Sequence, residues 1–384
     1  MISTIGKNVR ISVWGGSHEP AIGVDITGIP VGTEIDMDKL TAFLRRRAPG
    51  NSIFATRRKE PDIPLPLSGL EPCSIHRSDA VQSDTVSNSD PSGKRMIVTD
   101  NTISLEIRNT DTRSADYRAL RTVPRPGHAD YTARLRYGDS LNMAGGGPFS
   151  ARMTAPLCIA GGIAMQILER QGITIGGHIY SIADARDEPF DPTAVNAGLL
   201  NDLKTKDMAV ISRSAKLEMQ KRIWLAMEDR DSVGGVVEVC GLNIPAGIGG
   251  AMYDGLESTL APLFFGIPAV KGVEFGAGFA ATLLRGSQNN DAFYYEGDTV
   301  KTRTNNHGGI LGGITTGMPL IARLAFKPTP SIAKEQASVD LYRKENTTLR
   351  VKGRHDPCVV TRAVPIAEAA MALGLLDCIM EVKR

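Results

Sequence analysis

The stretch Gly145-Gly-Gly-Pro-Phe-Ser-Ala-Arg152 is a glycine-rich turn that leads into a predicted helix. Ser150 is a residue type that caps helix N-termini, and an apolar helix of small residues is predicted after it, to about Arg170. Because proline lacks a backbone N–H, the regular part of this helix is expected to begin near Pro156. The Gly161-Gly162 pair would let a neighbouring element pack closely, so the helix is predicted to be buried.

Short strands and helices alternate on both sides of this helix. Strands are predicted at residues 9–13, 22–26, 96–107, 173–182, 233–242, 269–275 and 320–326. Helices are predicted before residue 48 and over residues 214–228, 254–265 and 366–380. The alternation is similar in both halves of the chain, which indicates two related β-α-β units in a single α+β domain over residues 1–384.

Two of these helices have a predicted apolar face. On the helix before residue 48 this face is formed by Leu40, Phe43 and Leu44. That helix is predicted to end in Arg45-Arg46-Arg47, which has two interpretations, a solvated complement to the helix dipole or a clamp for an anion. In residues 214–228 the predicted apolar face is formed by Leu217, Ile223, Trp224 and Met227.

The composition is typical of a soluble globular protein. The 384 residues are 42% hydrophobic and 22% charged, and a net charge of +2 is too small for binding to nucleic acid or membrane by bulk electrostatics. The five cysteines are widely spaced without a C-x-x-C pair, so neither a metal site nor a disulfide framework is predicted. No signal peptide or membrane span is predicted, and a cytoplasmic location with reduced thiols is expected.

Polar segments rich in glycine or proline separate the apolar elements. Those near residues 48–66, 286–307 and 333–350 are poor in apolar anchors and are predicted to be mobile loops. The segment from Gly308 to Gly317 has too many glycines for an ordinary strand or helix, and suits close backbone approach to a flat ligand. The Lys327-Pro-Thr-Pro-Ser331 segment either presents an ammonium and two hydroxyls on a fixed backbone or simply caps a strand.

Three of the stiffened loops carry a histidine. The prolines and glycine of Arg125-Pro-Gly-His-Ala-Asp-Tyr131 restrict the backbone that presents His128 beside an acid, although a solvated surface turn is an alternative. The other two loops are Gly15-Gly-Ser-His-Glu-Pro20 and Gly353-Arg-His-Asp-Pro357. Since histidine exchanges a proton near neutral pH, these loops together favour an enzyme of general acid–base chemistry acting on a phosphorylated or carboxylated compound, with an aromatic cofactor.

Several segments, in order along nearly the whole chain, resemble the signature segments of the chorismate synthase family. They are Gly16-Ser-His18, Gly28-Ile-Pro30, Arg125-Pro-Gly-His-Ala-Asp-Tyr131, Ser150-Ala-Arg152, Ala269-Val-Lys-Gly-Val-Glu274, Arg285-Gly-Ser-Gln-Asn289, Gly309-Ile-Leu-Gly-Gly313, Lys327-Pro-Thr329 and Gly353-Arg-His-Asp-Pro-Cys358. Their order and length make the resemblance specific.

The resemblance implies an activity, a fold and an assembly. Members of this family convert 5-enolpyruvylshikimate 3-phosphate to chorismate, the last common step of the shikimate pathway. The reaction is a 1,4-anti elimination of phosphate by a carbon–oxygen lyase, and it requires reduced FMN although there is no net redox change. The family fold is a β-α-β sandwich with helices packed between antiparallel sheets, and the usual assembly is a homotetramer. Whether NAD(P)H serves as the flavin reductant here stays open.

The resemblance also implies roles for individual residues. His128 would be the acid on the phosphate side, His18 would protonate or hold the reduced flavin, and Asp356 beside the flavin would help to receive the ring proton. Flavin binding carries over to Ser150, Ala269, Gly312, Lys327, Pro328, Thr329, Pro330, Ser331 and Arg354. Binding of anionic substrate or NADP carries over to Arg46, Arg47, Arg134 and Arg152.

A few positions depart from the family pattern. The acid of Gly15-Gly-Ser-His-Glu19 follows the histidine instead of preceding it, and Pro148-Phe149 replaces an arginine and a serine. Ala48 interrupts the arginine run, Ile53 replaces an anion-binding arginine, and Pro268 replaces a polar residue. The alternative is therefore a non-catalytic or altered-specificity relative that binds flavin or another anion. Tighter FMN binding in the presence of substrate would distinguish the active enzyme.

Overall fold

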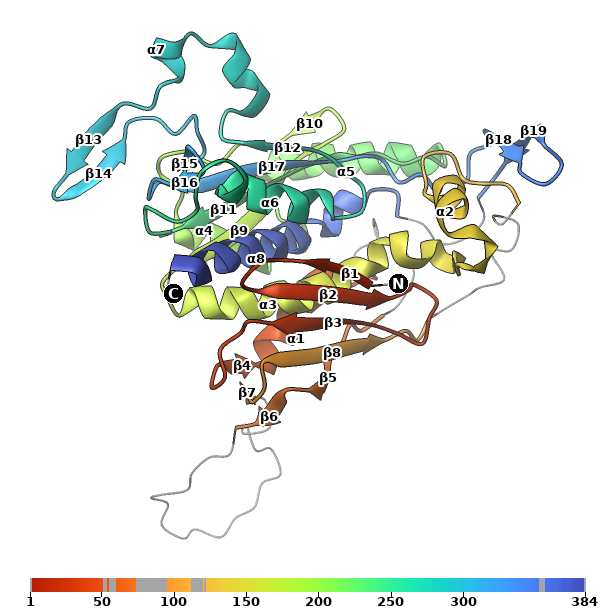
Figure 1. Ribbon diagram of the computed structural model, residues 1–384. Coiled ribbons are helices and arrows are strands. Elements are labelled where there is room, and N and C mark those ends of the chain that lie inside the picture. The colour runs from red at the N-terminus through yellow and green to blue at the C-terminus, as the bar shows by residue number, and fades with distance from the viewer. Residues whose placement is uncertain are drawn as a thin grey trace, which may run out of the picture.

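The computed structural model describes residues 2–50, 54, 60–73, 95–111, 120, 122–351 and 356–382. Two antiparallel five-stranded sheets enclose a layer of helices, which confirms the α+β sandwich (Figure 1). The first sheet has the order β1 (Ile2–Ile5), β2 (Arg10–Gly15), β3 (Ala21–Thr27), β8 (Thr102–Arg108) and β5 (Leu65–Ser68). The second has the order β10 (Ala185–Arg186), β9 (Thr174–Ile182), β11 (Gly235–Leu242), β17 (Leu320–Phe326) and β12 (Val270–Phe275).

Four helices form the layer between the sheets, and smaller elements surround it. The central helices are α1 (Met37–Arg47), α3 (Thr154–Glu169), α6 (Leu256–Phe265) and α8 (Val364–Val382). The others are α2 (Asp130–Tyr137), α4 (Ala197–Thr205), α5 (Arg213–Glu228) and α7 (Gly286–Asn289). The short 3-10 helices are η3 (Gly138–Ser140), η4 (Ala144–Phe149), η5 (Ala151–Met153), η6 (Met252–Asp254), η7 (Gly278–Leu283) and η8 (Val359–Arg362).

The remaining strands form a small sheet and three hairpins. The small sheet has the order β4 (Glu34–Asp36), β7 (Arg95–Val98) and β6 (Leu70–Pro72). The hairpins are β13 (Phe293–Glu296) with β14 (Thr299–Thr302), β15 (Ile310–Leu311) with β16 (Ile314–Thr315), and β18 (Gln336–Asp340) with β19 (Glu345–Leu349). Figure 1 shows the β13–β14 hairpin and α7 extending away from the two main sheets.

Helix α3 lies at the centre of the helix layer because its glycines let two neighbouring helices approach. A Cβ atom at Gly161 would lie 2.3 Å from the Cβ atom of Ala369 in α8, and one at Gly162 would lie 2.7 Å from Leu40 in α1. Neither gap has room for a side chain. The predicted burial of this helix is confirmed, and Ser150 caps the short η5 that precedes it by accepting from the N–H of Arg152 at 3.3 Å.

The length and apolar composition of α3 and the residues before it are those of a membrane-spanning helix, although no membrane span was predicted from the sequence. Residues 151–169 are long and apolar enough to cross a membrane, as judged by length and composition. However, 83% of this window is buried inside the protein. Its apolar character is therefore accounted for by packing between two sheets in the core.

The predicted apolar face of α5 is confirmed at Ile223 and wrong at Leu217, Trp224 and Met227. The buried residues of this helix are Ala215, Met219, Ile223 and Ala226. Leu217 is 59% exposed and Trp224 is 51% exposed, with the indole N–H donating to Glu228 at 3.0 Å. The helix contacts β9 and β10, and its buried face carries these four residues, so the contact with the sheet decides which face is buried.

A row of charged residues crosses the second sheet. His178 in β9 is fully buried, with Nδ1 at 3.0 Å from Asp187 and Nε2 at 2.9 Å from Glu238 in β11. The other carboxylate oxygen of Glu238 accepts a hydrogen bond from Arg323 in β17 at 2.8 Å. Burial acts to lower the pKa of His178, but its two carboxylate partners outweigh burial and raise this pKa above its ordinary value of 6.5.

The segments predicted as mobile loops contain regular elements where the structure describes them. Residues 286–307 include α7 and the β13–β14 hairpin, and residues 333–350 include the β18–β19 hairpin. In residues 48–66, positions 51–53 and 55–59 lie outside the described residues. The mobility of all three segments and the single-domain organisation stay predictions. The glycine-rich segment 308–317 contains the short β15–β16 hairpin, although it was expected to form no ordinary strand.

Candidate active site

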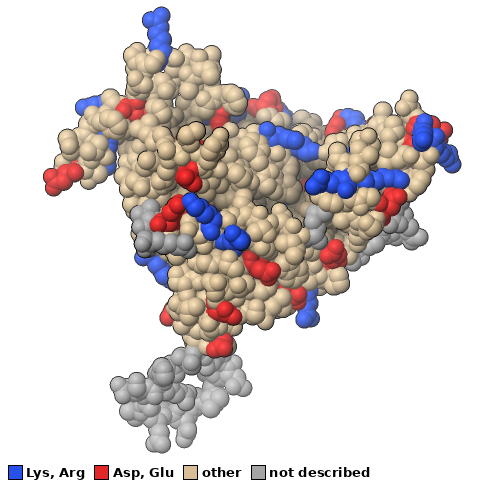
Figure 2. All heavy atoms as spheres, in the orientation of Figure 1, with Lys and Arg blue, Asp and Glu red and all other residues tan. Residues whose placement is uncertain are grey.

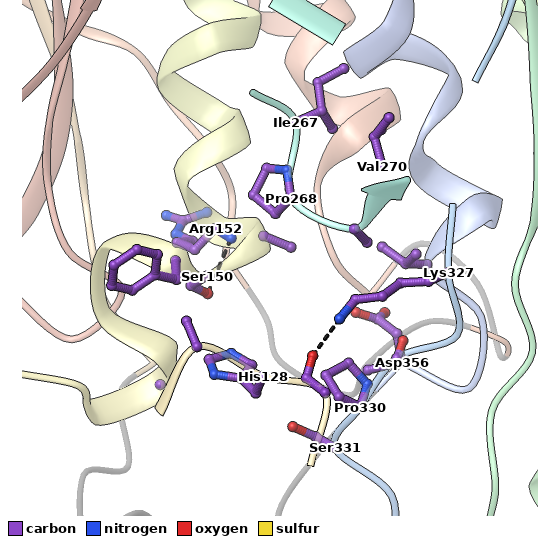
Figure 3. A pocket seen from close by; sticks show the side chains of 18 of the residues that line it. His128, Ser150, Arg152, Ile267, Pro268, Val270, Lys327, Pro330, Ser331 and Asp356 are labelled. Atoms are coloured by element: carbon purple, nitrogen blue, oxygen red, sulfur yellow. Dashed lines mark hydrogen bonds between the residues drawn. The ribbon is translucent and has the colours of Figure 1, made fainter. Parts of the chain in front are cut away.

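A cavity of about 460 Å³ opens beside the N-terminal end of α3 (Figure 3). Most of the residues that line it belong to the segments 125–129, 145–152, 265–271, 327–331 and 356–362. The charged side chains of the wall are Arg47, Arg125, Arg152, Lys271, Lys327, Arg362 and the acid Asp356. On the face seen in Figure 2 the two signs of charge are interspersed, whereas cations outnumber acids in the cavity wall. Such a cavity suits a small anionic ligand.

The glycine turn before α3 brings two of the predicted catalytic histidines to one place. Gly145 and Gly146 have φ values of +65° and +90°, which larger residues rarely adopt. A Cβ atom at Gly145 would lie 2.4 Å from the ring of His18, and one at Gly146 would lie 3.2 Å from Nε2 of His128. The two imidazoles therefore lie against consecutive glycines, and His128 lines the cavity whereas His18 does not.

His128 is oriented by a buried ion pair. Arg125 binds both carboxylate oxygens of Asp130, at 2.7 Å from Nε and 2.7 Å from Nη2, and Nδ1 of His128 lies 2.9 Å from Oδ1 of the same acid. Burial would raise the pKa of Asp130, but the hydrogen bonds from Arg125 and His128 hold it well below its ordinary value of 3.8. Asp130 is therefore an anion that fixes the Nδ1 side of the ring and leaves Nε2 for a ligand.

The segment after β17 forms the opposite wall. Lys327 donates to the carbonyl oxygen of Gly127, and Ser331 accepts from Nη1 of Arg125 at 3.0 Å, so this segment is tied to the histidine loop (Figure 3). Burial and the nearby Lys271 lower the pKa of Lys327 below its ordinary value of 10.5. Thr329 has a buried hydroxyl without a hydrogen-bond partner among the residues that the structure describes. Two ammonium groups and an unpaired hydroxyl fit the phosphate of a flavin.

Two further predicted residues complete this side of the cavity. Ala269 has φ +79°, an unusual conformation for a residue with a side chain, and its carbonyl oxygen accepts from the N–H of Lys327 at 2.9 Å. Asp356 accepts from Nη2 of Arg362 at 2.5 Å, and each of these two side chains is 11% exposed. Figure 3 shows Asp356 on the same side of the cavity as Lys327. The cavity therefore holds an acid–base candidate on each side.

The two other arginines of the wall are neutralised by acids of the protein. Arg47 is fully buried and forms an ion pair with Asp62, which also binds Arg152. Arg152 is held in addition by Asn109, which accepts from its Nε at 3.0 Å. Because Arg47 has no exposed surface, the interpretation of the arginine run as solvated is wrong for this residue. Arg47 and Arg152 both line the cavity, with Asp62 bound to each of them, and the anion-clamp interpretation of the arginine run stays a prediction.

Several residues that the resemblance assigned to the site do not line this cavity. Arg46 binds the buried Glu368 through two hydrogen bonds at 2.5 Å and 3.0 Å, which is a structural contact. Arg134 lies 3.2 Å from Asp139 in an ion pair on α2 and η3, and Pro328 is not part of the cavity wall. Gly312 lies in the β15–β16 turn, apart from the cavity. Arg354 and Ile53 lie outside the described residues.

Three residues in or beside the cavity were not predicted as site residues from the sequence. Lys271 follows Ala269 within a segment that resembles the family, so its position in that segment was an available signal. Arg362 lies one helical turn beyond the Gly353 to Cys358 segment, and its pairing with Asp356 depends on η8. Asp62 carried no local signal, because both of its arginine partners are distant in the sequence.

Comparisons with known proteins agree with the fold and show the family of the chain. The family model described as "Chorismate synthase" matches residues 9–90 and 91–380. A protein named chorismate synthase from Lancefieldella parvula is 41% identical over 388 residues, covering 98% of this chain and 96% of the relative. One from Korarchaeum cryptofilum is 40% identical over 380 residues, covering 99% and 98%. A crystal structure of chorismate synthase has the same fold, with a TM-score of 0.73 at 24% identity over 98% of this chain and 93% of that one. The chain belongs to the chorismate synthase family.

Proposed function

We propose that this protein forms chorismate by the 1,4-anti elimination of phosphate from 5-enolpyruvylshikimate 3-phosphate, as a carbon–oxygen lyase of the shikimate pathway. The observation that carries the proposal is the cavity in which His128 and Asp356 face one space lined with cations. The relatives that are 40% and 41% identical over nearly the whole chain favour this activity over the non-catalytic alternative.

His128 is the proposed acid for the departing phosphate. Its Nδ1 is 2.9 Å from the Asp130 carboxylate, so Nε2 is the nitrogen that would face the ligand. A proton on Nε2 stabilises the charge that develops on the phosphate oxygen. Asp356 is the proposed acceptor of the ring proton, and the hydrogen bond from Arg362 keeps its carboxylate oriented toward the cavity.

Reduced FMN is the proposed cofactor. When bound, reduced FMN supplies electron density to the elimination and is recovered, so there is no net redox change. Its phosphate would be held by Lys271, Lys327 and Thr329, whose hydroxyl is otherwise unpaired among the described residues. Ser150, Ala269, Pro330 and Ser331 would hold the rest of the cofactor. His18, which lies against Gly145, would hold a proton on the cofactor side.

The proposal extends to the assembly, the reductant and the location of the protein. Exposed aromatic and leucine side chains support a homotetramer, among them Phe279, Leu283, Phe293 and Tyr295. NAD(P)H is the proposed reductant of the flavin. All five cysteines are free thiols, which supports a reducing compartment such as the cytoplasm. We propose no nucleic acid or membrane as a partner.

The deciding experiment is an anaerobic reaction. The protein is mixed with chemically reduced FMN and 5-enolpyruvylshikimate 3-phosphate, and both chorismate and inorganic phosphate are measured. We expect equal amounts of the two products from the native protein, and loss of both in His128→Ala and Asp356→Ala. Asp202→Ala, at an exposed position on α4 and outside the cavity wall, is the matched control and should retain activity. Tight FMN binding without product from the native protein would refute the proposal.

A further inference from the structure

Asp62 joins the two buried arginines of the cavity wall. Its Oδ2 accepts hydrogen bonds from Nε of Arg47 at 3.0 Å and from Nη2 of the same residue, and its Oδ1 accepts one from Nη1 of Arg152. The exposed fractions of the side chains are 0% for Arg47 and Asp62 and 4% for Arg152. Two of the cations that line the cavity are therefore bound to a carboxylate of the protein.

The charge of this cluster opposes the binding of another anion. Glu60 lies 3.8 Å from Nη2 of Arg152, so two arginines face two carboxylates and the cluster is neutral overall. A buried cluster that is already neutral gains little Coulomb energy from a further anion, while the anion still loses its hydration. An anion can bind well to Arg47 and Arg152 only if one of the two carboxylates withdraws.

Asp62 is the carboxylate that is free to withdraw. Glu60 is anchored by the N–H of Thr110 at 3.1 Å, by the hydroxyl of Thr110 at 2.9 Å and by the N–H of Asp111 at 3.3 Å. By contrast, within the part of the chain that the structure describes, the hydrogen bonds to the Asp62 carboxylate come from the two arginines alone. Its position thus depends on the arginines themselves.

Arg152 offers a second sign that a ligand is expected here. Its Nη2 atom is buried and forms only the 3.8 Å ion-pair contact with Glu60, without a hydrogen bond to any described residue, although the side chain lines the cavity. A guanidinium nitrogen without a hydrogen bond in a buried side chain is costly unless a ligand supplies an acceptor. Asn109 accepts a hydrogen bond from Nε of Arg152, and this contact does not involve Asp62. We therefore expect the guanidinium group, and with it Nη2, to keep its orientation when Asp62 moves.

We propose that Asp62 is an internal counter-ion that competes with an oxyanion of the ligand for Arg47 and Arg152. In the empty cavity it neutralises the two arginines, and it leaves Arg152 when a phosphate or carboxylate group of the ligand binds. Asp62 touches none of the reacting atoms, and it acts by setting the affinity of the site for anions. The identity of the natural ligand rests on the proposed function. The competition between Asp62 and an oxyanion rests on the contacts of Arg47 and Arg152 alone.

The test uses inorganic phosphate as the probe. Its dissociation constant is measured by isothermal titration calorimetry for the native protein and for Asp62→Asn, which keeps the size of the side chain and removes its charge. We expect the dissociation constant to fall by about tenfold or more, which corresponds to at least about 1.4 kcal/mol. Asp184→Asn, which alters the exposed ion pair with Arg222, is the matched control and should change nothing. An unchanged or weaker affinity in Asp62→Asn would overturn the proposal.

A second probe and a second readout make the test complete. Acetate replaces phosphate in a parallel titration, and the probe with the larger gain identifies the preferred oxyanion. If Asp62→Asn is insoluble in chloride, its soluble yield is compared in phosphate and chloride at equal ionic strength. Selective recovery in phosphate supports the competition, and equal recovery overturns it. Neither readout depends on flavin or turnover, so failure of chorismate formation and failure of this inference are distinguishable.

Discussion

The Nδ1 atom of His128 lies 2.9 Å from Oδ1 of Asp130, an oxygen that Arg125 also binds at 2.7 Å. The hydrogen bonds from Arg125 and His128 lower the pKa of Asp130, so the carboxylate is ionised. The same carboxylate fixes the direction of the imidazole ring. Because the contact uses Nδ1, the ring presents Nε2 to the cavity. The orientation of the proposed acid therefore depends on a residue that does not itself line the cavity.

Replacing Asp130 by asparagine should impair turnover more than substrate binding. The asparagine no longer stabilises a protonated His128, so kcat should fall by about 100-fold while KM changes little. Asp139→Asn, which removes the exposed acid beside Arg134, is the matched control. A large rise in KM at unchanged kcat would contradict this role.

Stability should depend on His178 below neutral pH and lose that dependence as the pH rises. The pKa of His178 is raised above 6.5 in the folded state, so folding favours the protonated ring. Its contribution is complete below about pH 6.5, the value in the unfolded chain, and is lost as the pH rises through the folded pKa.

This prediction is checked by urea unfolding of the native protein and His178→Gln between pH 6 and pH 9. The difference between the two free energies of unfolding should be largest at the acidic end. A difference that stays constant across the range would show that the ring is held neutral between Asp187 and Glu238.

The close contact between α3 and α8 should not tolerate a side chain at Gly161. Gly161→Ala would gain helix propensity, but its Cβ atom would lie 2.3 Å from Ala369. The overpacking should outweigh that gain and lower the free energy of unfolding by about 1–3 kcal/mol. Gly286→Ala is the control, because a Cβ atom there would meet nothing within 4 Å. Equal stability of the two variants in urea would disprove the close packing of these helices.

Lys327 should contribute charge to cofactor binding. Lys327→Met keeps most of the side-chain length and removes the ammonium, so the dissociation constant of reduced FMN should rise by about 10- to 100-fold, the loss of one charged hydrogen bond. Binding is followed anaerobically by the absorbance of the reduced flavin. Lys334→Met is the control, since Lys334 pairs with Asp229 and Asp231 outside the cavity. Equal losses in both variants would indicate a long-range effect of net charge.

Many helices and strands could be predicted from sequence patterns that span only a few residues. The strands at 173–182 and 320–326 match β9 and β17 closely, because runs of β-branched residues are a local signal. The first helix ends at Arg47 before Ala48, as the cations and the following Pro-Gly predicted. The orientation of α5 could not be predicted in this way, since it depends on which face meets β9 and β10.

The sequence by itself determined the positions of most helices and strands, the burial of α3 through Gly161 and Gly162, and the family to which the chain belongs. These features depend on neighbours in the chain or on ordered motifs. Only the tertiary structure decided that Asp62 lies between Arg47 and Arg152, and that Arg46 binds Glu368. Ion pairs between distant positions are set by the packing of whole elements. A buried charge without a partner is strongly destabilising, and the fold decides which opposite charge lies close to it.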